Sequence, residues 1–155
     1  MADCTVVYGD ILDQSVDAIV NPWNSNVIPW WLLLPQGVSG AIRKRAGSDA
    51  FRPLTTAGFL SPGTALYAPP GKLPIKGIIH VAALTPYWTT SEAIVTSCVR
   101  DATRIAAEHN MTSLAFPLLG AGIGGMNPDV SRALIEQTAA EVASDISIRI
   151  VIHRQ

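Results

Sequence analysis

Short runs of apolar residues, most of them closed by turn-forming residues, recur along the whole chain. Runs of this length that end at Gly, Asn, Asp or Pro are typical of buried strands. The predicted strands are Cys4–Tyr8, Ala18–Val20, Thr64–Ala68, Gly77–Ala83, Ser113–Leu119 and Ile146–Ile152.

Two segments between these strands show the three- and four-residue apolar spacing of helices. Gly37–Ala46 has this spacing, and Gly47 behind it is a natural C-terminal stop. The second segment opens with Thr89-Thr-Ser-Glu92, which has the form of a capping box. An apolar stripe from Ile94 to Ala106 follows it, so we predict a helix there.

A third helix is predicted from Asn127-Pro-Asp129 to about Ser144. An asparagine cap, a first-turn proline and a carboxylate that suits the helix dipole follow one another at its start. Strands that alternate with helices predict an α/β layered sheet covered on both faces. In such sheets, ligands bind beyond the carboxyl ends of the strands.

Composition narrows the class of protein. A chain of 155 residues with 48% hydrophobic and 15% charged residues is expected to form one folded domain over residues 1–155. Lys and Arg total 11 and Asp and Glu total 12, so the net charge is −1. This balance argues against binding to nucleic acid or to an anionic membrane through bulk charge, and we expect neither partner.

The cysteine content and the apolar runs indicate a cytoplasmic protein. Cys4 and Cys98 are too few for a disulfide scaffold or a cysteine-based zinc site. The N-terminus lacks the pattern of a secretory signal. The longest apolar run, Val27–Leu34, is interrupted by Pro29 and is far shorter than the roughly 20 residues of a membrane helix.

The most informative motif is the glycine-rich segment Gly120–Gly125, between a predicted strand and a capped helix. Successive backbone amides of such a loop can face one concavity and hold a phosphate or diphosphate. The segment also matches G-x-G-x-x-G, but it follows the fifth predicted strand and too little chain remains for a dinucleotide-binding unit. A close-packed turn that needs glycine for steric reasons is the other interpretation.

Three further features have a structural and a functional interpretation. The loop Leu34–Gly40 leads into a helix whose free amides and dipole can hold a phosphate. Asp10, Asn21 and Asn24 follow strands, where each can form a turn or bind a ligand through hydrogen bonds. The segment Trp30–Leu34 can pack over the core, form a ligand wall or mediate self-association.

The histidines provide no obvious catalytic or metal-binding motif. His80 lies within an apolar strand, where a hydrogen-bonded core histidine is the expected role. No pair of histidines has zinc-ligand spacing, and we expect neither a metal nor a cofactor.

Taken in order, these segments resemble the macrodomain family, whose members are α/β modules that bind ADP-ribose. The family patterns are G-D-I, D-A-I-V-N-A-A-N, G-V-D-G-A-I, P-G-x-x-L-P…V-I-H and F-P-A-I-S-T-G-I-Y-G. The matching segments are Gly9-Asp-Ile11, Asp17-Ala-Ile-Val-Asn-Pro-Trp-Asn24, Gly37-Val-Ser-Gly-Ala-Ile42, Pro70-Gly71, Leu73-Pro74, Ile78-Ile-His80 and Phe116-Pro-Leu-Leu-Gly-Ala-Gly-Ile-Gly-Gly125. The resemblance implies a three-layer α-β-α sandwich with a central mixed sheet of about six strands.

The resemblance also implies a role for each motif. Asp10 would bind the adenine amine near the Ile11 amide, and Asn24 would face the distal ribose. The diphosphate would be held by backbone amides of the two loops, namely those of Gly37, Val38, Ser39, Gly40, Gly120, Ala121, Gly122, Ile123, Gly124 and Gly125.

The chain departs from the family pattern at four places. Its first loop has Leu34-Pro35-Gln36 in place of a run of glycines. Ser39 stands where many hydrolytic members carry an aspartate, and Gly124 stands where they often carry an aromatic residue. The adenine-stacking aromatic residue after the last strand is missing, and Arg154 is a candidate replacement through a cation–π contact.

The leading hypothesis is hydrolysis of mono-ADP-ribose from modified protein side chains, with an ester to Asp or Glu as the scissile bond. Asn24 and Ser39 are the candidate catalytic residues, although a neutral serine cannot replace a carboxylate base. The partner is then ADP-ribose or a mono-ADP-ribosylated protein. A non-catalytic ADP-ribose reader and an ADP-ribose 1″-phosphate phosphatase are the alternatives.

Overall fold

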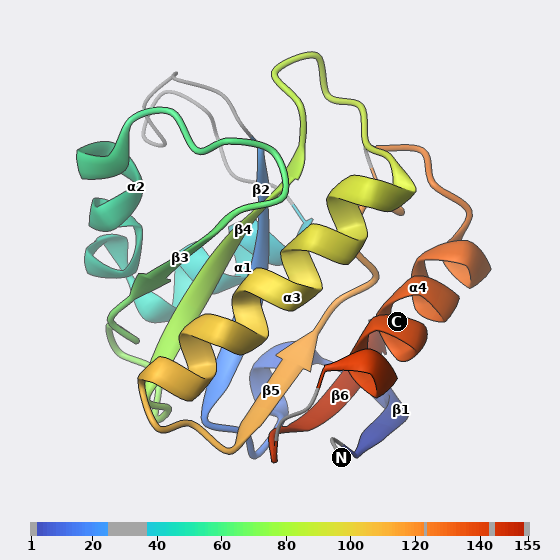
Figure 1. Ribbon diagram of the computed structural model, residues 1–155. Coiled ribbons are helices and arrows are strands. Elements are labelled where there is room, and N and C mark those ends of the chain that lie inside the picture. The colour runs from blue at the N-terminus through green and yellow to red at the C-terminus, as the bar shows by residue number, and fades with distance from the viewer. Residues whose placement is uncertain (1–2, 25–36, 123, 143–144, 154–155) are drawn as a thin grey trace.

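A mixed sheet forms the centre of the computed structural model, which describes residues 3–24, 37–122, 124–142 and 145–153 (Figure 1). Within these residues the sheet has six strands in the order β1-β6-β5-β2-β4-β3. All neighbouring pairs are parallel except β3 and β4, which are antiparallel. The strands are β1 (Cys4–Gly9), β2 (Ala18–Asn24), β3 (Ala65–Ala68), β4 (Gly77–Leu84), β5 (Ser113–Phe116) and β6 (Ser147–His153).

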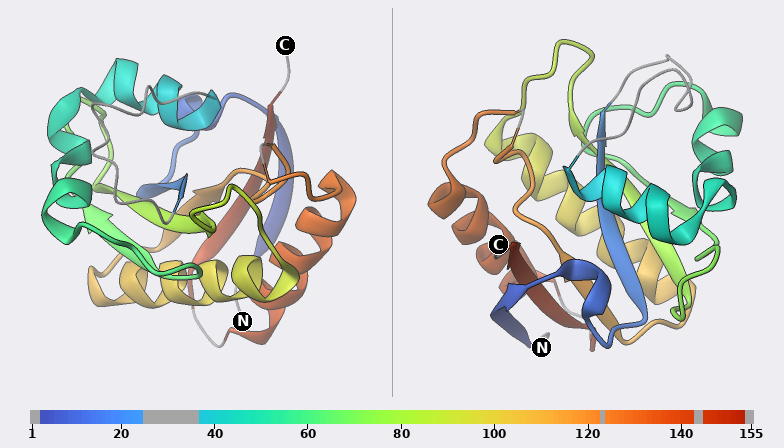
Figure 2. Two further views of the ribbon diagram at one scale, coloured as in Figure 1. Left: turned by 90° about the horizontal axis from the view of Figure 1, so that it is seen from above. Right: turned by 180° about the vertical axis from the view of Figure 1, so that it is seen from behind.

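Helices cover both faces of this sheet, which gives the three-layer sandwich that the family resemblance implies (Figure 2). Helices α3 (Glu92–Glu108) and α4 (Pro128–Glu141) lie on one face. Helices α1 (Gly37–Ala46) and α2 (Arg52–Ala57) lie on the other, with the short 3₁₀ helix η2 (Ser48–Phe51) between them. Another 3₁₀ helix, η1 (Ile11–Asp13), follows β1.

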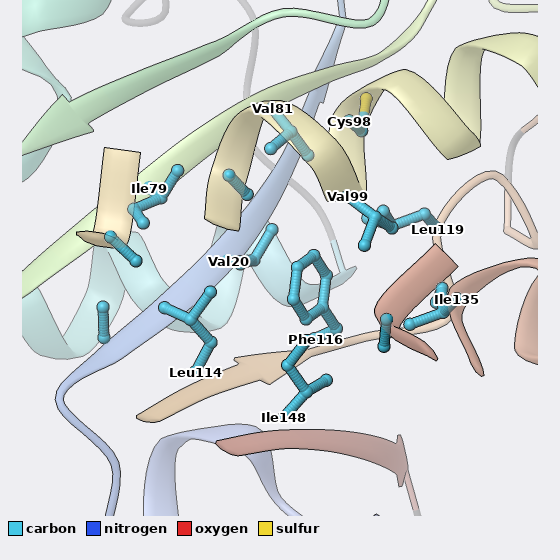
Figure 3. Close-up of a cluster of buried hydrophobic side chains, with 14 of the residues drawn as sticks. Val20, Ile79, Val81, Cys98, Val99, Leu114, Phe116, Leu119, Ile135 and Ile148 are labelled. Atoms are coloured by element: carbon cyan, nitrogen blue, oxygen red, sulfur yellow. The ribbon is translucent and has the colours of Figure 1, made fainter. Parts of the chain in front are cut away.

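Alternate strand residues supply two hydrophobic cores, one on each side of the sheet. In β4, Ile79 and Val81 pack toward α3, and Ile78 and Ala82 pack toward α1 and η2. Both faces are covered, so this strand is an unbroken apolar run instead of an alternating one. Figure 3 shows the larger core, where Phe116 lies among side chains of β2, β4, β6 and α3.

The ends of the long helices agree only in part with the prediction. Asn127 caps α4 as predicted, because its Oδ1 accepts from the Asp129 amide at 2.8 Å. The predicted capping box at Thr89 is wrong, since Ser91 caps α3 by accepting from the Ile94 amide at 3.2 Å. Thr89 instead shares a hydrogen bond with the Thr85 hydroxyl at 2.7 Å, which keeps it in the preceding loop.

The ends of other elements also differ from the prediction. The predicted end of the second strand at Val20 is wrong, because β2 continues to Asn24 and places Asn21 inside the strand and not in a turn. The fifth strand is shorter than predicted and ends at Phe116. Helix α4 ends at Glu141, and the predicted end at Ser144 lies outside the described residues. Helix α2 was not predicted from the sequence. Leu54 is its only buried side chain, so the segment lacks the repeated apolar spacing that marks a helix.

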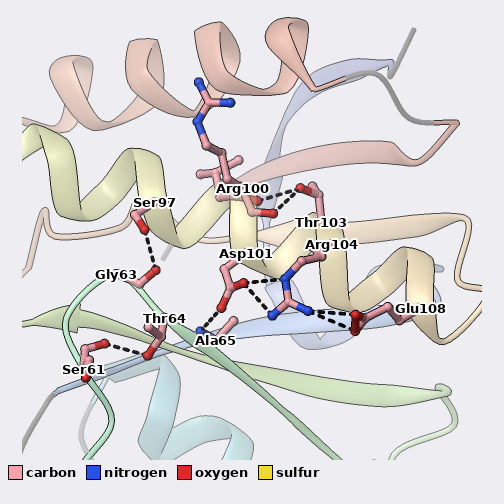
Figure 4. A network of polar contacts seen from close by, with 11 residues as sticks. Ser61, Gly63, Thr64, Ala65, Ser97, Arg100, Asp101, Thr103, Arg104 and Glu108 are labelled. Carbon is pink, nitrogen blue, oxygen red and sulfur yellow. Dashed lines mark hydrogen bonds and ion pairs between the residues drawn. The ribbon is translucent and has the colours of Figure 1, made fainter.

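Edge strand β3 is tied to α3 by a polar network (Figure 4). Asp101 accepts from the Ala65 amide at 2.7 Å, and Ser97 donates to the Gly63 carbonyl at 2.8 Å. Arg104 pairs with Asp101 and Glu108 on the outer side of α3. These bonds fix the antiparallel edge of the sheet next to β4. None of the helices in the described ranges is long and apolar enough to span a membrane.

Candidate ligand-binding site

A pocket of about 270 Å³ opens at the carboxyl ends of β1, β6 and β5. The end of β1, the start of α1, the loop after β5 and the end of β6 all contribute to its wall. The lining residues are Gly9, Ile11, Val38, Pro117, Leu118, Ala121, Gly122, Val151 and His153. The two loops that sequence analysis assigned to phosphate binding therefore border one cavity.

The glycines of the loop after β5 fall into two groups. A Cβ at Gly120 would lie 2.8 Å from the Thr90 Cγ2, and a Cβ at Gly124 would lie 2.6 Å from the Gly120 carbonyl oxygen. These two positions need glycine because the loop is packed closely against its neighbours. At Gly122, by contrast, a Cβ would meet no described atom within 4 Å. Gly125 is also open, but its φ of 75° is unfavourable for any residue with a side chain. Gly122 lines the pocket without that constraint, so it is the position in this loop that can take a larger side chain.

Some of the loop amides already have partners. The Ala121 amide donates to the Leu118 carbonyl at 3.3 Å, and the Gly125 amide donates to the Gly122 carbonyl at 3.1 Å. Ile123 lies outside the described residues. Among the predicted phosphate ligands of this loop, Gly122 is therefore the position that the pocket geometry favours.

The start of α1 forms the opposite wall of the pocket. The helix begins at Gly37, and Val38 lines the cavity. Unpaired amides and the helix dipole make the first turn of a helix a favourable place for an anion. Gly40 lies in the same first turn, and Ser39 is buried beneath it. The Ser39 side chain thus turns toward the interior of the protein.

Ser39 is the first member of a buried chain of hydrogen bonds that joins α1, β2, β4 and η2. The Ser39 hydroxyl donates to Asn21 Oδ1 at 2.7 Å and lies 3.0 Å from the Pro22 carbonyl oxygen. Asn21 Nδ2 lies 2.9 Å from His80 Nδ1. His80 Nε2 lies 2.7 Å from the carbonyl oxygen of Ala50.

The direction of this chain follows from its last acceptor. The Ala50 carbonyl can only accept, so His80 Nε2 carries the proton and Nδ1 accepts from the Asn21 amide. Asn21 Oδ1 is then left to accept, and residue 39 must supply a donor. Serine meets that requirement, whereas an ionised aspartate at position 39 could not donate to Asn21.

His80 is a neutral core histidine, as the apolar strand predicted. Complete burial lowers its pKa to about 4, although the bond to Ala50 opposes this effect. The neutral ring accepts at one nitrogen and donates at the other, and both nitrogens are already bonded inside the protein. His80 therefore has no free position from which to take a proton from a substrate.

The remaining candidate residues are only partly placed by the structure. Asp10 has the structural role that the sequence allowed for it. It forms a turn in which its Oδ1 accepts a hydrogen bond from the Leu12 amide at 2.9 Å. Its neighbours Gly9 and Ile11 line the pocket. Asn24 ends β2 opposite Leu84 of β4, but its side chain is not described. The segment Trp30–Leu34 and Arg154 also lie outside the described residues.

His153 is a pocket residue that the sequence analysis missed. It ends β6, is exposed and lines the cavity beside Val151. Its imidazole is an aromatic ring at the end of the last strand, where the family pattern places an aromatic residue. The signal was present in the sequence, because His153 closes the final apolar run.

A second, larger cavity of about 400 Å³ lies at the opposite edge of the sheet, near the amino ends of β2 and β5. Its polar wall includes Asp17, whose carboxylate accepts from the Thr112 amide at 2.7 Å. That bond holds the pKa of Asp17 below its ordinary value. Asp17 thereby ties the starts of two strands together, which is a structural role.

The described part of the chain supports neither metal binding nor catalysis by a cysteine thiolate. No group of three His, Cys, Asp or Glu side chains there is arranged to hold a metal ion. Cys98 is buried, and burial raises the pKa of its thiol to about 12, so it is not a thiolate nucleophile at neutral pH.

The fold and the pocket define an α/β domain in which the start of a helix and a glycine-rich loop line one cavity at the carboxyl edge of the sheet. A family model described as "Macro domain" matches residues 20–135. The chain belongs to the macro domain family.

Individual relatives agree with this membership. A macro domain-containing protein of Streptomyces griseus is 35% identical over 95% of this chain and 85% of its own length. An O-acetyl-ADP-ribose deacetylase of Enterobacter is 33% identical over 88% of this chain and 76% of its own length. A solved macrodomain of Oceanobacillus iheyensis with ADP has a TM-score of 0.81 and 23% identity, and covers 97% of this chain and 83% of its own. The last similarity concerns the fold.

Proposed function

We propose that this protein binds ADP-ribose in the 270 Å³ pocket and hydrolyses mono-ADP-ribose from modified protein side chains, with an Asp or Glu ester as the bond that breaks. The observation that carries the proposal is the meeting of Val38 at the start of α1 with Gly122 in one cavity. Family membership and the Enterobacter relative, which by its name acts on an ADP-ribose ester, support it.

The lining residues suggest how the ligand lies. The adenosine would occupy the end of the pocket at β1 and β6, with Asp10 accepting from the adenine amine. There the His153 ring would supply the stacking surface that the family pattern assigns to another aromatic residue. The diphosphate would lie between Gly122 and the first turn of α1. The distal ribose would then extend toward the carboxyl ends of β2 and β4, at Asn24.

The proposed mechanism uses no protein base. The Ser39 hydroxyl donates a hydrogen bond to Asn21, and neutral His80 is hydrogen-bonded at both ring nitrogens. An ester is intrinsically more labile than an amide, so orientation of a water molecule against the ester can supply much of the rate. The substrate's diphosphate would help to hold that water, and Asn24 would fix the ribose. Water cleaves the ester, and free ADP-ribose and the side-chain carboxylic acid are released.

Two alternatives are each favoured by one observation. Deacetylation of O-acetyl-ADP-ribose is favoured by the name of the Enterobacter relative, and it also breaks an ester on the distal side of the same ligand. A reader that binds ADP-ribose without chemistry is favoured by Ser39, because no carboxylate stands at that position. A phosphatase acting on ADP-ribose 1″-phosphate would use the same pocket.

Hydrolysis is tested with a glutamate-linked mono-ADP-ribosylated protein and with O-acetyl-ADP-ribose, by measuring the rate of ADP-ribose release. We expect Asn24→Ala to lower kcat about tenfold or more, because a misoriented ribose loses its alignment with the water. Ser39→Ala should lower kcat much less, because its hydroxyl points away from the ligand. If the wild type releases no product from either substrate but binds ADP-ribose in calorimetry, the reader is correct instead.

A further inference from the structure

The loop between β4 and α3 displays exposed aromatic side chains that nothing in the pocket requires. Tyr87 is 85% exposed and Trp88 is 38% exposed. Exposed aromatic rings on one loop are the side chains most enriched at the energetic centres of protein interfaces. The surrounding segment Pro86–Ser91 carries no Asp, Glu, Lys or Arg, so a partner would be recognised without ion pairs.

Hydrogen bonds hold this loop in one shape. The Thr85 amide donates to the Thr89 carbonyl at 2.8 Å, and the Trp88 amide donates to the Thr85 carbonyl at 3.0 Å. The Thr85 hydroxyl also accepts from the Tyr87 amide at 3.2 Å. Trp88 is kept at a positive φ of 63°, which is an uncommon conformation for a bulky residue. A preorganised loop loses little conformational entropy when its aromatic rings bind a partner.

The loop stands beside the distal end of the proposed ligand path. Figure 1 shows it rising above the carboxyl end of β4, next to the segment that links β5 to α4, and Figure 2 agrees. Thr90 lies against Gly120 and Gly124 of the glycine-rich loop, closely enough that a Cβ at either glycine would touch it. In the sheet order, β5, β2 and β4 follow β1 and β6, so this loop lies beyond the pocket on the side away from His153.

We propose that Tyr87, supported by Trp88, contacts the polypeptide to which the distal ribose is attached. This inference rests on the proposed function, because it takes the direction of the ligand from it. The ring would lie against the peptide beside the modified side chain, and the phenol would hydrogen-bond to peptide groups. Such contacts do not depend on the charge of the target. The loop would therefore favour ADP-ribose on an extended protein segment over free ADP-ribose.

The test compares two quantities for each variant: kcat/KM for release from a mono-ADP-ribosylated protein, and the calorimetric Kd for free ADP-ribose. For Tyr87→Ala we expect kcat/KM to fall about tenfold, through KM, while the Kd stays within about twofold of the wild type. Tyr87→Phe should retain most of kcat/KM because it keeps the ring. Tyr8→Ala is the matched control, since Tyr8 is 54% exposed on β1 at the other edge of the sheet. It should leave the ratio of the two quantities unchanged.

The outcomes separate the two proposals. If wild-type protein neither binds free ADP-ribose nor acts on the modified protein, the proposed function fails. If wild-type protein binds free ADP-ribose but does not cleave it from the modified protein, the Kd for the modified protein replaces kcat/KM in the same comparison. The inference is overturned if Tyr87→Ala leaves the ratio of kcat/KM to Kd unchanged. Light scattering then shows whether the same variant changes the oligomeric state. An unchanged ratio together with a changed oligomeric state would identify the loop as a self-association surface.

Discussion

Gly122→Glu is expected to weaken ADP-ribose binding about 100-fold or more while leaving the fold intact. The position faces open space, so the longer side chain fits without steric conflict. Its carboxylate would enter the proposed diphosphate site, where two like charges about 4 Å apart repel by roughly 4 kcal/mol in a partly screened environment. Isothermal titration calorimetry with ADP-ribose measures the loss.

Gly122→Gln separates charge from size in this experiment. Glutamine has nearly the same shape as glutamate but no charge, so it should weaken binding by no more than about tenfold, or roughly 1.4 kcal/mol. Thermal unfolding should be nearly the same for both variants and the wild type. Unaltered affinity in Gly122→Glu, with a normal unfolding curve, would mean that the diphosphate does not bind at this loop.

Acidification from pH 7 to pH 5 is expected to remove about 2 kcal/mol of unfolding free energy through His80 alone. The pKa of His80 is about 4 in the folded protein, below its ordinary value of 6.5, because the ring is fully buried. Between these two values the unfolded chain binds a proton that the folded protein does not bind. The stability contributed by His80 is therefore present at pH 7 and is lost as the pH falls from 6.5 toward 4. Urea unfolding at both pH values measures the difference.

His80→Gln is the matched variant for this prediction. Glutamine offers one acceptor and one donor, as the neutral histidine does toward Asn21 and Ala50, but it does not titrate. The loss of stability between pH 7 and pH 5 should be smaller in the variant by about 2 kcal/mol. Asp17 contributes little to the stability difference between pH 7 and pH 5. Its pKa is lowered from an ordinary value of 3.8, so its carboxylate is ionised in the folded and the unfolded protein at both pH values. An equal loss in both proteins would show that His80 is not the buried neutral group described above.

The strands and the two long helices could be predicted because their signals are local. Short apolar runs marked every strand, and the stripe from Ile94 to Ala106 marked α3. The cap of α3 was assigned to Thr89 because Glu92 stands three residues after it, whereas Ile94 stands three residues after the actual cap, Ser91. Thr89 instead bonds to Thr85 in the preceding loop, and that bond is not marked by any capping motif in the sequence.

The candidate site was predictable where it consists of backbone and was not where it depends on distant partners. Glycine patterns at strand ends marked the two loops that line the pocket. The inward direction of the Ser39 hydroxyl depends on Asn21, His80 and Ala50, which come from different elements of the fold. Only the assembled sheet shows that the acceptor at Ala50 determines the need for a donor at position 39.

The central claim is that the loop after β5 and the start of α1 form the binding site for ADP-ribose. The most direct test is an NMR titration of the ¹⁵N-labelled protein with ADP-ribose, following individual backbone amides to saturation. We predict the largest shifts at Val38, Gly122 and Val151, around the pocket at the carboxyl edge. Shifts concentrated instead at Asp17, Ile75 and Ser113, around the opposite cavity, or no shifts at saturating ligand, would contradict the claim.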